Sequence, residues 1–119
     1  MDAMFCETDS FNQPICDWDV SNVTTMNGMF DRAKSFNQPI GDWDVSNVKD
    51  MEGMFCSAMS FNQPIGDWDV SNVIGMGWMF CEAKSFNQDL STWQINNDHN
   101  TNMFIECPIE EEYKPKGII

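Results

Sequence analysis

The sequence predicts an α/β fold: a right-handed solenoid of about four coils, each with one short parallel strand and one short helix. Three observations predict it. A unit of 25 residues repeats along the chain, an apolar alternation of period two marks a strand, and apolar gaps of three, three, one and three mark a helix. Strand–helix–strand crossovers are right-handed in nearly all proteins, which sets the predicted hand of the coil.

The repeat is nearly verbatim. The word Phe-Asn-Gln-Pro-Ile begins at Phe11, returns at Phe36 and Phe61, and ends as Phe-Asn-Gln-Asp-Leu at Phe86. A fixed period of this size is typical of stacked arrays, in which one unit cannot bury its apolar face alone. The predicted array is 1–106, with units 1–10 (partial), 11–35, 36–60, 61–85 and 86–106 (a degenerate cap), followed by an acidic tail at 107–119.

The elements are expected at fixed places in each unit. Trp43 and Val45 alternate with polar residues, which predicts a strand with both side chains pointing inward. Met51, Met54 and Phe55 then follow with the spacing of one helix face. Glycines in these helical segments disfavour a helix, so a flatter β-solenoid without a true helix is the alternative. They are Gly28, Gly53, Gly75 and Gly77.

The apolar frame Ile-x-x-Trp-x-Val-x-x-Val, at residues 40–48, is similar to the strand segment of leucine-rich repeats. The full unit, Ser-Phe-Asn-Gln-Pro-Ile-Gly-Asp-Trp-Asp-Val-Ser-Asn-Val followed by Met-x-x-Met-Phe, resembles the BspA-like leucine-rich-repeat surface proteins over residues 1 to about 104. This resemblance implies a leucine-rich-repeat-like fold, a non-enzymatic role in adhesion or protein binding, and a location at the cell surface or outside the cell. Residues 1–10 lack the basic and apolar regions of a signal peptide.

Charge narrows the choice of partners. The net charge is −13, from 19 acidic and 6 basic residues. Such a surface argues against nucleic acid, because binding phosphates needs Lys and Arg, and it favours basic proteins or divalent cations. No apolar run is long enough to span a membrane. His99 is the only histidine and no catalytic motif or cofactor motif occurs, so the sequence predicts neither an enzyme nor a required cofactor.

Stacking would bring equivalent residues of successive units into columns, and one of these columns is acidic. We expect it to face a basic or host-surface protein partner or, as a weaker hypothesis, Ca²⁺, which takes oxygen ligands. The competing interpretation is a solvated face that keeps the protein soluble. The weak metal candidates are Asp17, Asp19, Asp42, Asp44, Asp67 and Asp69. The partner-binding candidates are Asp19, Asp44, Asp69, Ser21, Ser46, Ser71 and Trp78.

Trp78 stands where other units have Gly28 and Gly53, so it is expected to be partly exposed and available for contact. The remaining aromatic columns are assigned to the core, and the asparagine columns, which include Asn97, to hydrogen bonds between units. The odd number of cysteines predicts mostly free thiols. Uncapped coil ends would allow copies of the chain to assemble end to end, which is the alternative to a partner-binding module.

Overall fold

Turns, rather than helices and strands, form the backbone of this protein. The computed structural model describes residues 1–96 and 98–118, and Asn97 of the predicted amide column lies outside them. Within the described residues there is no α-helix and no β-strand. The regular elements are one short 3₁₀ helix, η1 (Glu111–Tyr113), and two isolated parallel bridges, Thr25–Asp50 and Asp50–Gly75. The predicted α/β leucine-rich-repeat-like solenoid, with a strand and a helix in every coil, is therefore wrong.

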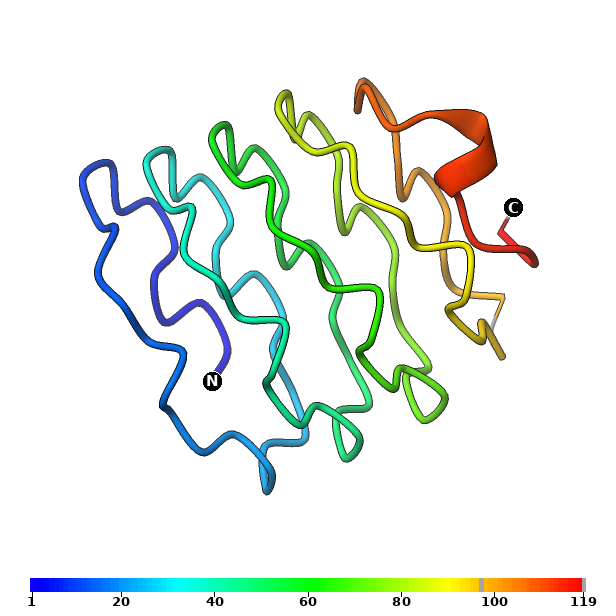
Figure 1. The fold of residues 1–119 in the computed structure, drawn as a ribbon, viewed down its shortest axis with the longest axis horizontal. Coiled ribbons are helices and arrows are strands. Elements are labelled where there is room, and N and C mark those ends of the chain that lie inside the picture. Colours follow the sequence, from blue (N-terminus) through cyan, green and yellow to red (C-terminus); the bar gives the residue numbers. More distant parts are fainter. Residues whose placement is uncertain (97, 119) are drawn as a thin grey trace.

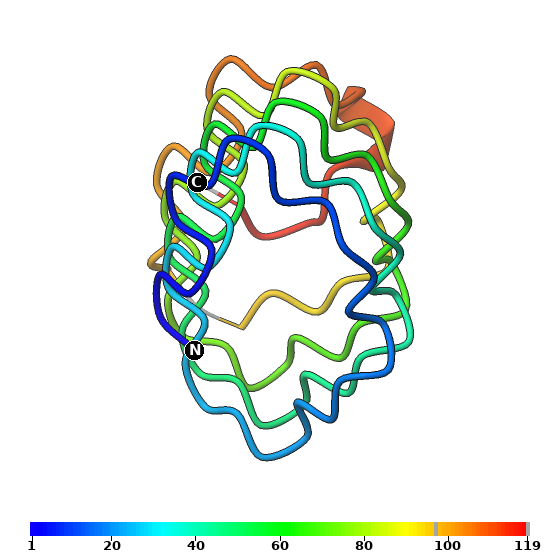
Figure 2. The ribbon, with the colours of Figure 1, turned by 90° about the vertical axis from the view of Figure 1, so that its left-hand side faces the viewer.

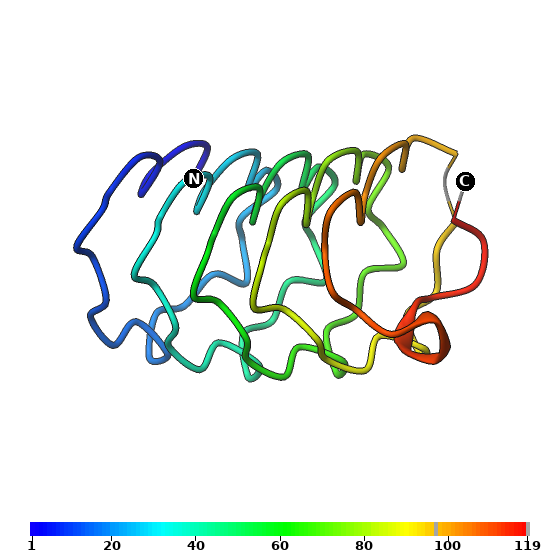
Figure 3. The same ribbon diagram turned by 90° about the horizontal axis from the view of Figure 1, so that it is seen from above.

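The chain instead forms a compact body in which successive 25-residue units lie side by side, from the N-terminus to the C-terminus (Figures 1 and 3). Its radius of gyration is 12.7 Å and its principal extents are 33 × 30 × 19 Å. Seen along the stack, the units follow nearly the same outline (Figure 2). Equivalent residues of neighbouring units are consequently in contact over most of the chain.

Hydrogen bonding explains why the predicted helix does not form. The Met54 N–H donates to Met51 O at 3.2 Å, a bond that spans three residues instead of the four of an α-helix. The next N–H, on Phe55, donates to Met79 O of the following unit at 2.8 Å. Gly53 has φ +64°, a left-handed conformation that no α-helix continues through. The apolar gaps belong to successive tight turns, whose remaining N–H groups bind the neighbouring unit.

The predicted strand fails for a similar reason. Trp43 and Val45 are both buried, so the alternation of inward and outward side chains is present. The Trp43 N–H, however, donates to Ile40 O within its own turn at 3.2 Å, and no ladder of backbone bonds joins this segment to its neighbours. The indole Nε1–H of Trp43 makes the connection between units, donating to Ile15 O at 3.1 Å.

Two sides of each unit are joined to the neighbouring units in opposite directions. On the turn side (residues 26–32, 51–57 and 76–82), backbone N–H groups donate to carbonyls of the unit that follows. On the amide side (residues 36–40, 61–65 and 86–90), the asparagine N–H groups and the glutamine side chains donate to the unit before. The Asn62 N–H donates to Asn37 Oδ1 at 2.9 Å, and Gln63 Nε2 donates to Asn37 O and Oδ1 at 3.1 Å.

Stacked aromatic rings fill the space between the two sides. Trp68 lies between Trp43 and Trp93, with ring centroids 6.5 and 6.4 Å away and planes nearly parallel. Phe55 lies in the same way between Phe30 and Phe80, at 5.5 and 5.4 Å. These rings are almost fully buried. Burial of these aromatic side chains removes a large apolar area from water and so stabilises the fold.

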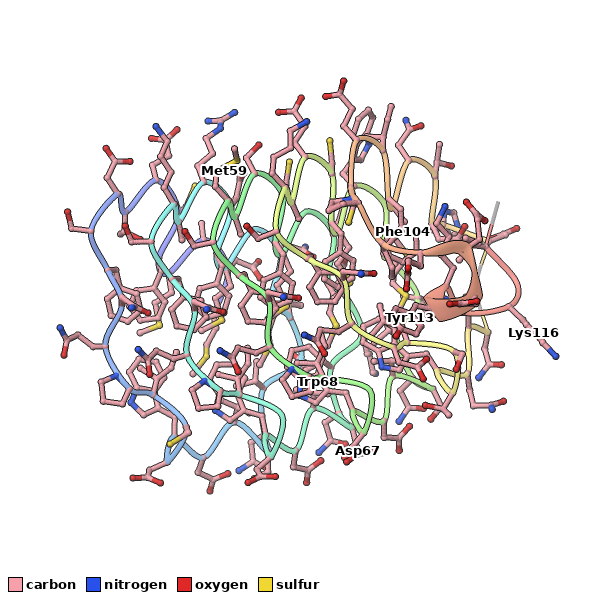
Figure 4. All side chains as sticks on the ribbon, turned by 45° about the horizontal axis from the view of Figure 1, so that its top comes forward. Met59, Asp67, Trp68, Phe104, Tyr113 and Lys116 are labelled. Atoms are coloured by element: carbon pink, nitrogen blue, oxygen red, sulfur yellow. The ribbon has the colours of Figure 1, made fainter. Side chains whose placement is uncertain are left out.

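The segment predicted as an acidic tail packs against the last unit over residues 107–118. Tyr113 O accepts the Leu90 N–H at 2.8 Å, and the Glu110 N–H donates to Asn87 Oδ1 at 3.0 Å, as the next unit would. Phe104 stacks on Phe80 at the end of a phenylalanine column and lies near Tyr113 (Figure 4). Lys114 Nζ lies 5.7 Å from the centroid of the Phe104 ring. Residues 107–118 therefore cover the apolar edge of unit 86–106.

Candidate functional site

Three of the predicted partner-binding aspartates form a regular row on the surface. Asp44 Oδ1 accepts hydrogen bonds from the Ser46 N–H at 3.1 Å and from Ser46 Oγ at 2.6 Å. The same pair of bonds recurs one unit before and one unit after, in Asp19 with Ser21 and Asp69 with Ser71. We call Asp19, Asp44 and Asp69 the carboxylate row.

The serines hold the carboxylate row in its charged form. The hydroxyl and N–H of Ser46 lower the pKa of the Asp44 carboxyl, and the charges of Asp69 and Asp19 oppose this shift only weakly. The serines lower the pKa of Asp19 and Asp69 in the same way. Hydrogen bonds donated to a carboxylate favour its ionised form. Three negative charges are thus fixed at the repeat distance of the units.

Amide side chains keep the turns of the row in register. Asn47 Nδ2 donates to Ser21 O and Asn72 Nδ2 donates to Ser46 O, both at 2.7 Å. Each serine therefore binds its own aspartate through the side chain and the next unit through its carbonyl. The asparagines in this position act between units, as the sequence predicts.

A shallow groove of about 450 Å³ is lined by two of the three remaining metal candidates, and the third, Asp17, is not part of its lining. Asp42 and Asp67 line it; Asp67 lies at the outer edge of the molecule, while the neighbouring Trp68 points inward (Figure 4). Gly41 is required here, because a Cβ on it would lie 2.6 Å from Pro64 O. The rest of the lining is Cys16, Pro39, Gly66, Gln88 and Asp89.

Sequence reasoning missed two residues of this groove. Asp89 replaces the proline of earlier units. The Ser91 hydroxyl and, second, the Ser91 N–H, which donates to Asp89 Oδ1 at 2.9 Å, lower the pKa of Asp89. The other is Gln88, whose Nε2 also joins units by donating to Asn62 O at 3.2 Å. The signal that could have identified Asp89 is its place in the repeat, since it adds a carboxylate where the unit otherwise has Pro39 or Pro64.

The predicted metal candidates do not come together as a chelating set. Among residues 1–96 and 98–118, no group of three or more His, Cys, Asp or Glu side chains could hold a metal ion. In the carboxylate row, one oxygen of each aspartate is already bound by its serine. The arrangement suits donors from several positions of a partner rather than a single cation.

Trp78 is 44% exposed, as its place outside the core pattern predicts. Ile74, which sequence reasoning missed, is 62% exposed and belongs to the same turn-forming segment. The repeat could have identified Ile74. Its equivalents are the polar residues Thr24 and Lys49, which indicates that this position faces solvent. Both residues lie on or next to the turn side, apart in sequence from the carboxylate row.

All five cysteines are free thiols in this structure, including Cys56 and Cys81, which occupy equivalent positions in neighbouring units. Burial raises the pKa of the Cys81 thiol to about 11, and the adjacent Cys56 adds to the shift. A thiol of this kind is protonated and unreactive at neutral pH. It therefore fills space rather than acting as a nucleophile.

None of the helices among the described residues has the length and apolar character needed to cross a membrane.

Comparison with known proteins corrects the family expected from the sequence. No curated protein and no solved structure matches the chain. A family model matches residues 1–113, and its description is a Mycoplasma protein of unknown function. Neither a BspA-like nor a leucine-rich-repeat family is found. With this match over nearly its whole length, the chain belongs to the DUF285 family.

Proposed function

We propose that the protein is a non-enzymatic interaction module that binds a basic protein partner along the carboxylate row. The observation that carries the proposal is the row itself: three serine-bound, ionised aspartates in equivalent positions of adjacent units. The overall charge of −13 supports it, since it attracts basic partners at long range. The fixed backbone geometry supports it further, because the carboxylates need no ordering on binding.

The spacing of the row indicates the form of the partner. Ring centroids of equivalent aromatic residues in adjacent units lie between 5.4 Å (Phe55 and Phe80) and 6.5 Å (Trp43 and Trp68) apart. In an extended chain, alternate residues lie on one face and repeat every 6.6 Å or so, from a rise of about 3.3 Å per residue. An extended segment with Lys or Arg at every second residue would place one cation opposite each carboxylate. We therefore expect a basic, extended segment as the bound form.

The test uses a synthetic peptide in which lysine and threonine alternate, titrated into the protein by calorimetry at low salt. Replacing the row with Asp19→Asn, Asp44→Asn and Asp69→Asn should weaken binding about tenfold in total, because each exposed charge pair contributes only modestly. The matched control replaces three exposed carboxylates elsewhere, with Asp9→Asn, Glu110→Gln and Glu112→Gln. Equal loss in both triple variants would show nonspecific charge attraction and contradict the proposal.

End-to-end assembly is the second candidate, and one observation favours it. Trp18 is 36% exposed, although Trp43, Trp68 and Trp93 of the same column are buried. Another copy that covered Trp18 would continue the column. Light scattering at rising concentration tests this candidate: growth into long particles would support assembly, and a constant mass would remove it.

Calcium binding is the remaining candidate, carried by Asp17, Asp42 and Asp67 together with the carboxylate row. It rests on charge alone, because the described carboxylates form no chelating group. Melting temperature measured against calcium at millimolar concentration tests it. A saturable rise would support a cation site, and an unchanged melting temperature would eliminate it.

A further inference from the structure

Unit 61–85 departs from its neighbours in one short segment, between Ile74 and Trp78. Both end residues are exposed, at 62% and 44%. The equivalent positions in the two preceding units carry Thr24 and Lys49 for Ile74, and glycine for Trp78. A single unit thus presents two large apolar side chains to solvent where the others present small or polar ones. Exposed apolar groups set within polar surroundings mark binding surfaces more often than chance placement does.

Trp78 occupies a turn position whose backbone is left-handed in the other units as well. Its φ is +60°, the left-handed conformation that Gly28 and Gly53 adopt at +61° and +64° in the equivalent positions. Glycine adopts this conformation more readily than an L-residue does, and the Trp78 indole is not buried in compensation. The same positive φ recurs at Ala3 (+54°) and Asn102 (+57°) in the corresponding turns, so the exposed indole, and not the backbone, distinguishes Trp78 from its equivalents.

Gly75 and Gly77 lie between Ile74 and Trp78, and their lack of side chains leaves room for acidic side chains of the preceding unit. A Cβ on Gly75 would lie 2.6 Å from Asp50 Oδ1, so the carboxylate occupies the space that a side chain would need. A Cβ on Gly77 would lie 4.0 Å from Glu52 Cγ, so the Glu52 side chain lies over Gly77. Ile74 and Trp78 are therefore the two ends of a segment along which two acidic groups lie.

Two residues with basic side chains adjoin this segment through their backbone: the Lys49 carbonyl accepts the Ile74 N–H at 2.7 Å, and the His99 carbonyl accepts the Met76 N–H at 2.8 Å. Two carboxylates against one ammonium leave the segment negative, in keeping with the whole molecule. A partner group that fits must be positively charged, must have an apolar stem, and must tolerate an aromatic face. Among protein side chains, arginine meets all three requirements best, because its guanidinium is planar and weakly hydrated.

We propose that Ile74, Trp78, Asp50 and Glu52 bind an arginine side chain of a protein partner. The methylene stem packs on Ile74, the guanidinium face covers the Trp78 indole, and its N–H groups donate to the Asp50 and Glu52 carboxylates. This arginine site is separate from the carboxylate row, so either proposal can fail without the other. Both sites select basic partners, but only the arginine site requires an aromatic face.

The test follows the indole N–H signal of Trp78 by NMR, assigned by its loss in Trp78→Gly. The probe is the capped peptide Leu-Arg-Leu, and the comparison is the same peptide with citrulline, which keeps the planar shape but has no charge. We expect a saturable shift of the Trp78 signal, and of the Gly75 and Gly77 amides, with the arginine peptide alone. No shift, or an equal shift with the citrulline peptide, would overturn the proposal.

Two variants restore the residues of equivalent positions and should therefore fold. Trp78→Gly copies Gly53, and Ile74→Thr copies Thr24. We expect Trp78→Gly to abolish the Gly77 shift while melting at the same temperature or higher, and Ile74→Thr to weaken binding severalfold. The carboxylate-row triple variant should bind the arginine peptide as the native protein does. A Trp78→Gly protein that keeps the Gly77 shift would contradict the arginine site.

Discussion

Asp31 is the residue at which the cysteine column is interrupted. It occupies the position of Cys6, Cys56 and Cys81, and its Oδ1 atom is buried with no hydrogen bond among the described residues. The nearest cation is Arg32 Nε, 4.0 Å from that oxygen, which is too far for a hydrogen bond. Burial raises the pKa of the Asp31 carboxyl, and the charge of Arg32 offsets the shift only in part.

We expect Asp31→Asn to raise the melting temperature at pH 7. A carboxyl whose pKa is raised in the folded state contributes stability below its unfolded pKa of 3.8 and loses it as pH rises through the folded value. At neutral pH the ionised form is therefore a net cost, which the neutral amide removes. The gain should be below about 4 °C, since the site is partly solvated. Calorimetry at pH 7 and pH 3 checks this, and a gain that persists at pH 3 would exclude the charge as its cause.

The thiols should differ widely in reactivity. Burial raises the pKa of Cys81 to about 11, so at pH 8 only about 0.1% is thiolate, the form that reacts. Cys16 is exposed at the edge of the groove. Iodoacetamide followed by peptide mass spectrometry should label Cys16 long before Cys81. Similar labelling rates for the two thiols would contradict the burial of Cys81.

At the scale of the element, the repeated part is a turn closed by an aspartate and a serine. The serine gives both its N–H and its hydroxyl to the carboxylate two residues earlier, as Ser46 does to Asp44. Bonds of this kind favour turns over helices and strands, because they satisfy the local backbone without a ladder. The same residues thus shape the backbone and keep the charge of the carboxylate row.

Ser46→Ala should raise the pKa of Asp44 toward its ordinary value by removing the hydroxyl donor, which is the main cause of the lowered pKa. A carboxyl with a lowered folded pKa contributes stability above its unfolded pKa and loses it as pH falls through the folded value. The native protein should lose stability as the pH falls below about 4, and the variant should lose less of it. The carboxyl carbon shifts of Asp44 measure the change, and Ser60→Ala, at an exposed serine, is the control.

The sequence could predict burial but not the elements. Trp43, Val45, Met51 and Met54 are all buried as their pattern indicates. Apolar gaps of three residues, however, fit a run of three-residue turns as well as a helix, and a residue such as Arg32, at φ +59°, carries no local signal of its left-handed backbone. The choice between helix and turns depends on N–H groups that bind the following unit, which is a tertiary effect.

For the site, the sequence could predict which aspartates form a row and that Trp78 is exposed. It could not predict that Gly75 admits the Asp50 carboxylate, because that contact joins two units through the absence of a side chain. It also could not predict the groove, whose lining comes from four successive units. Departures from the repeat, such as Asp89 and Ile74, were visible but had no assigned role before the units were placed side by side.

At the scale of the whole molecule, stability should depend on uninterrupted aromatic columns. Trp68 is 4% exposed, stacks on two indoles, and donates from Nε1 to Ile40 O at 3.0 Å. Trp18, in the same column, is 36% exposed and stands at the edge of the stack. The same residue type therefore contributes very differently at the two positions.

Trp68→Ala should lower the free energy of unfolding by about 3–5 kcal/mol, as expected for a buried aromatic replaced by alanine, and should leave Ile40 O unpaired. Trp18→Ala, the matched control, should cost clearly less because its indole is already partly solvated. Urea unfolding of both variants measures the difference. Equal costs would show that the column does not act as one continuous core.

The opposed directions of the bonds on the two sides of the stack have an electrostatic consequence. In an α-helix all peptide dipoles point the same way and sum to a partial charge at each end. Here the N–H of Phe55 points toward the following unit, while Gln63 Nε2 and the Trp68 indole point toward the preceding one. Their dipoles partly cancel, so lengthening the stack builds up little macrodipole. Ionised side chains, rather than the axis of the fold, then determine where a charged molecule approaches.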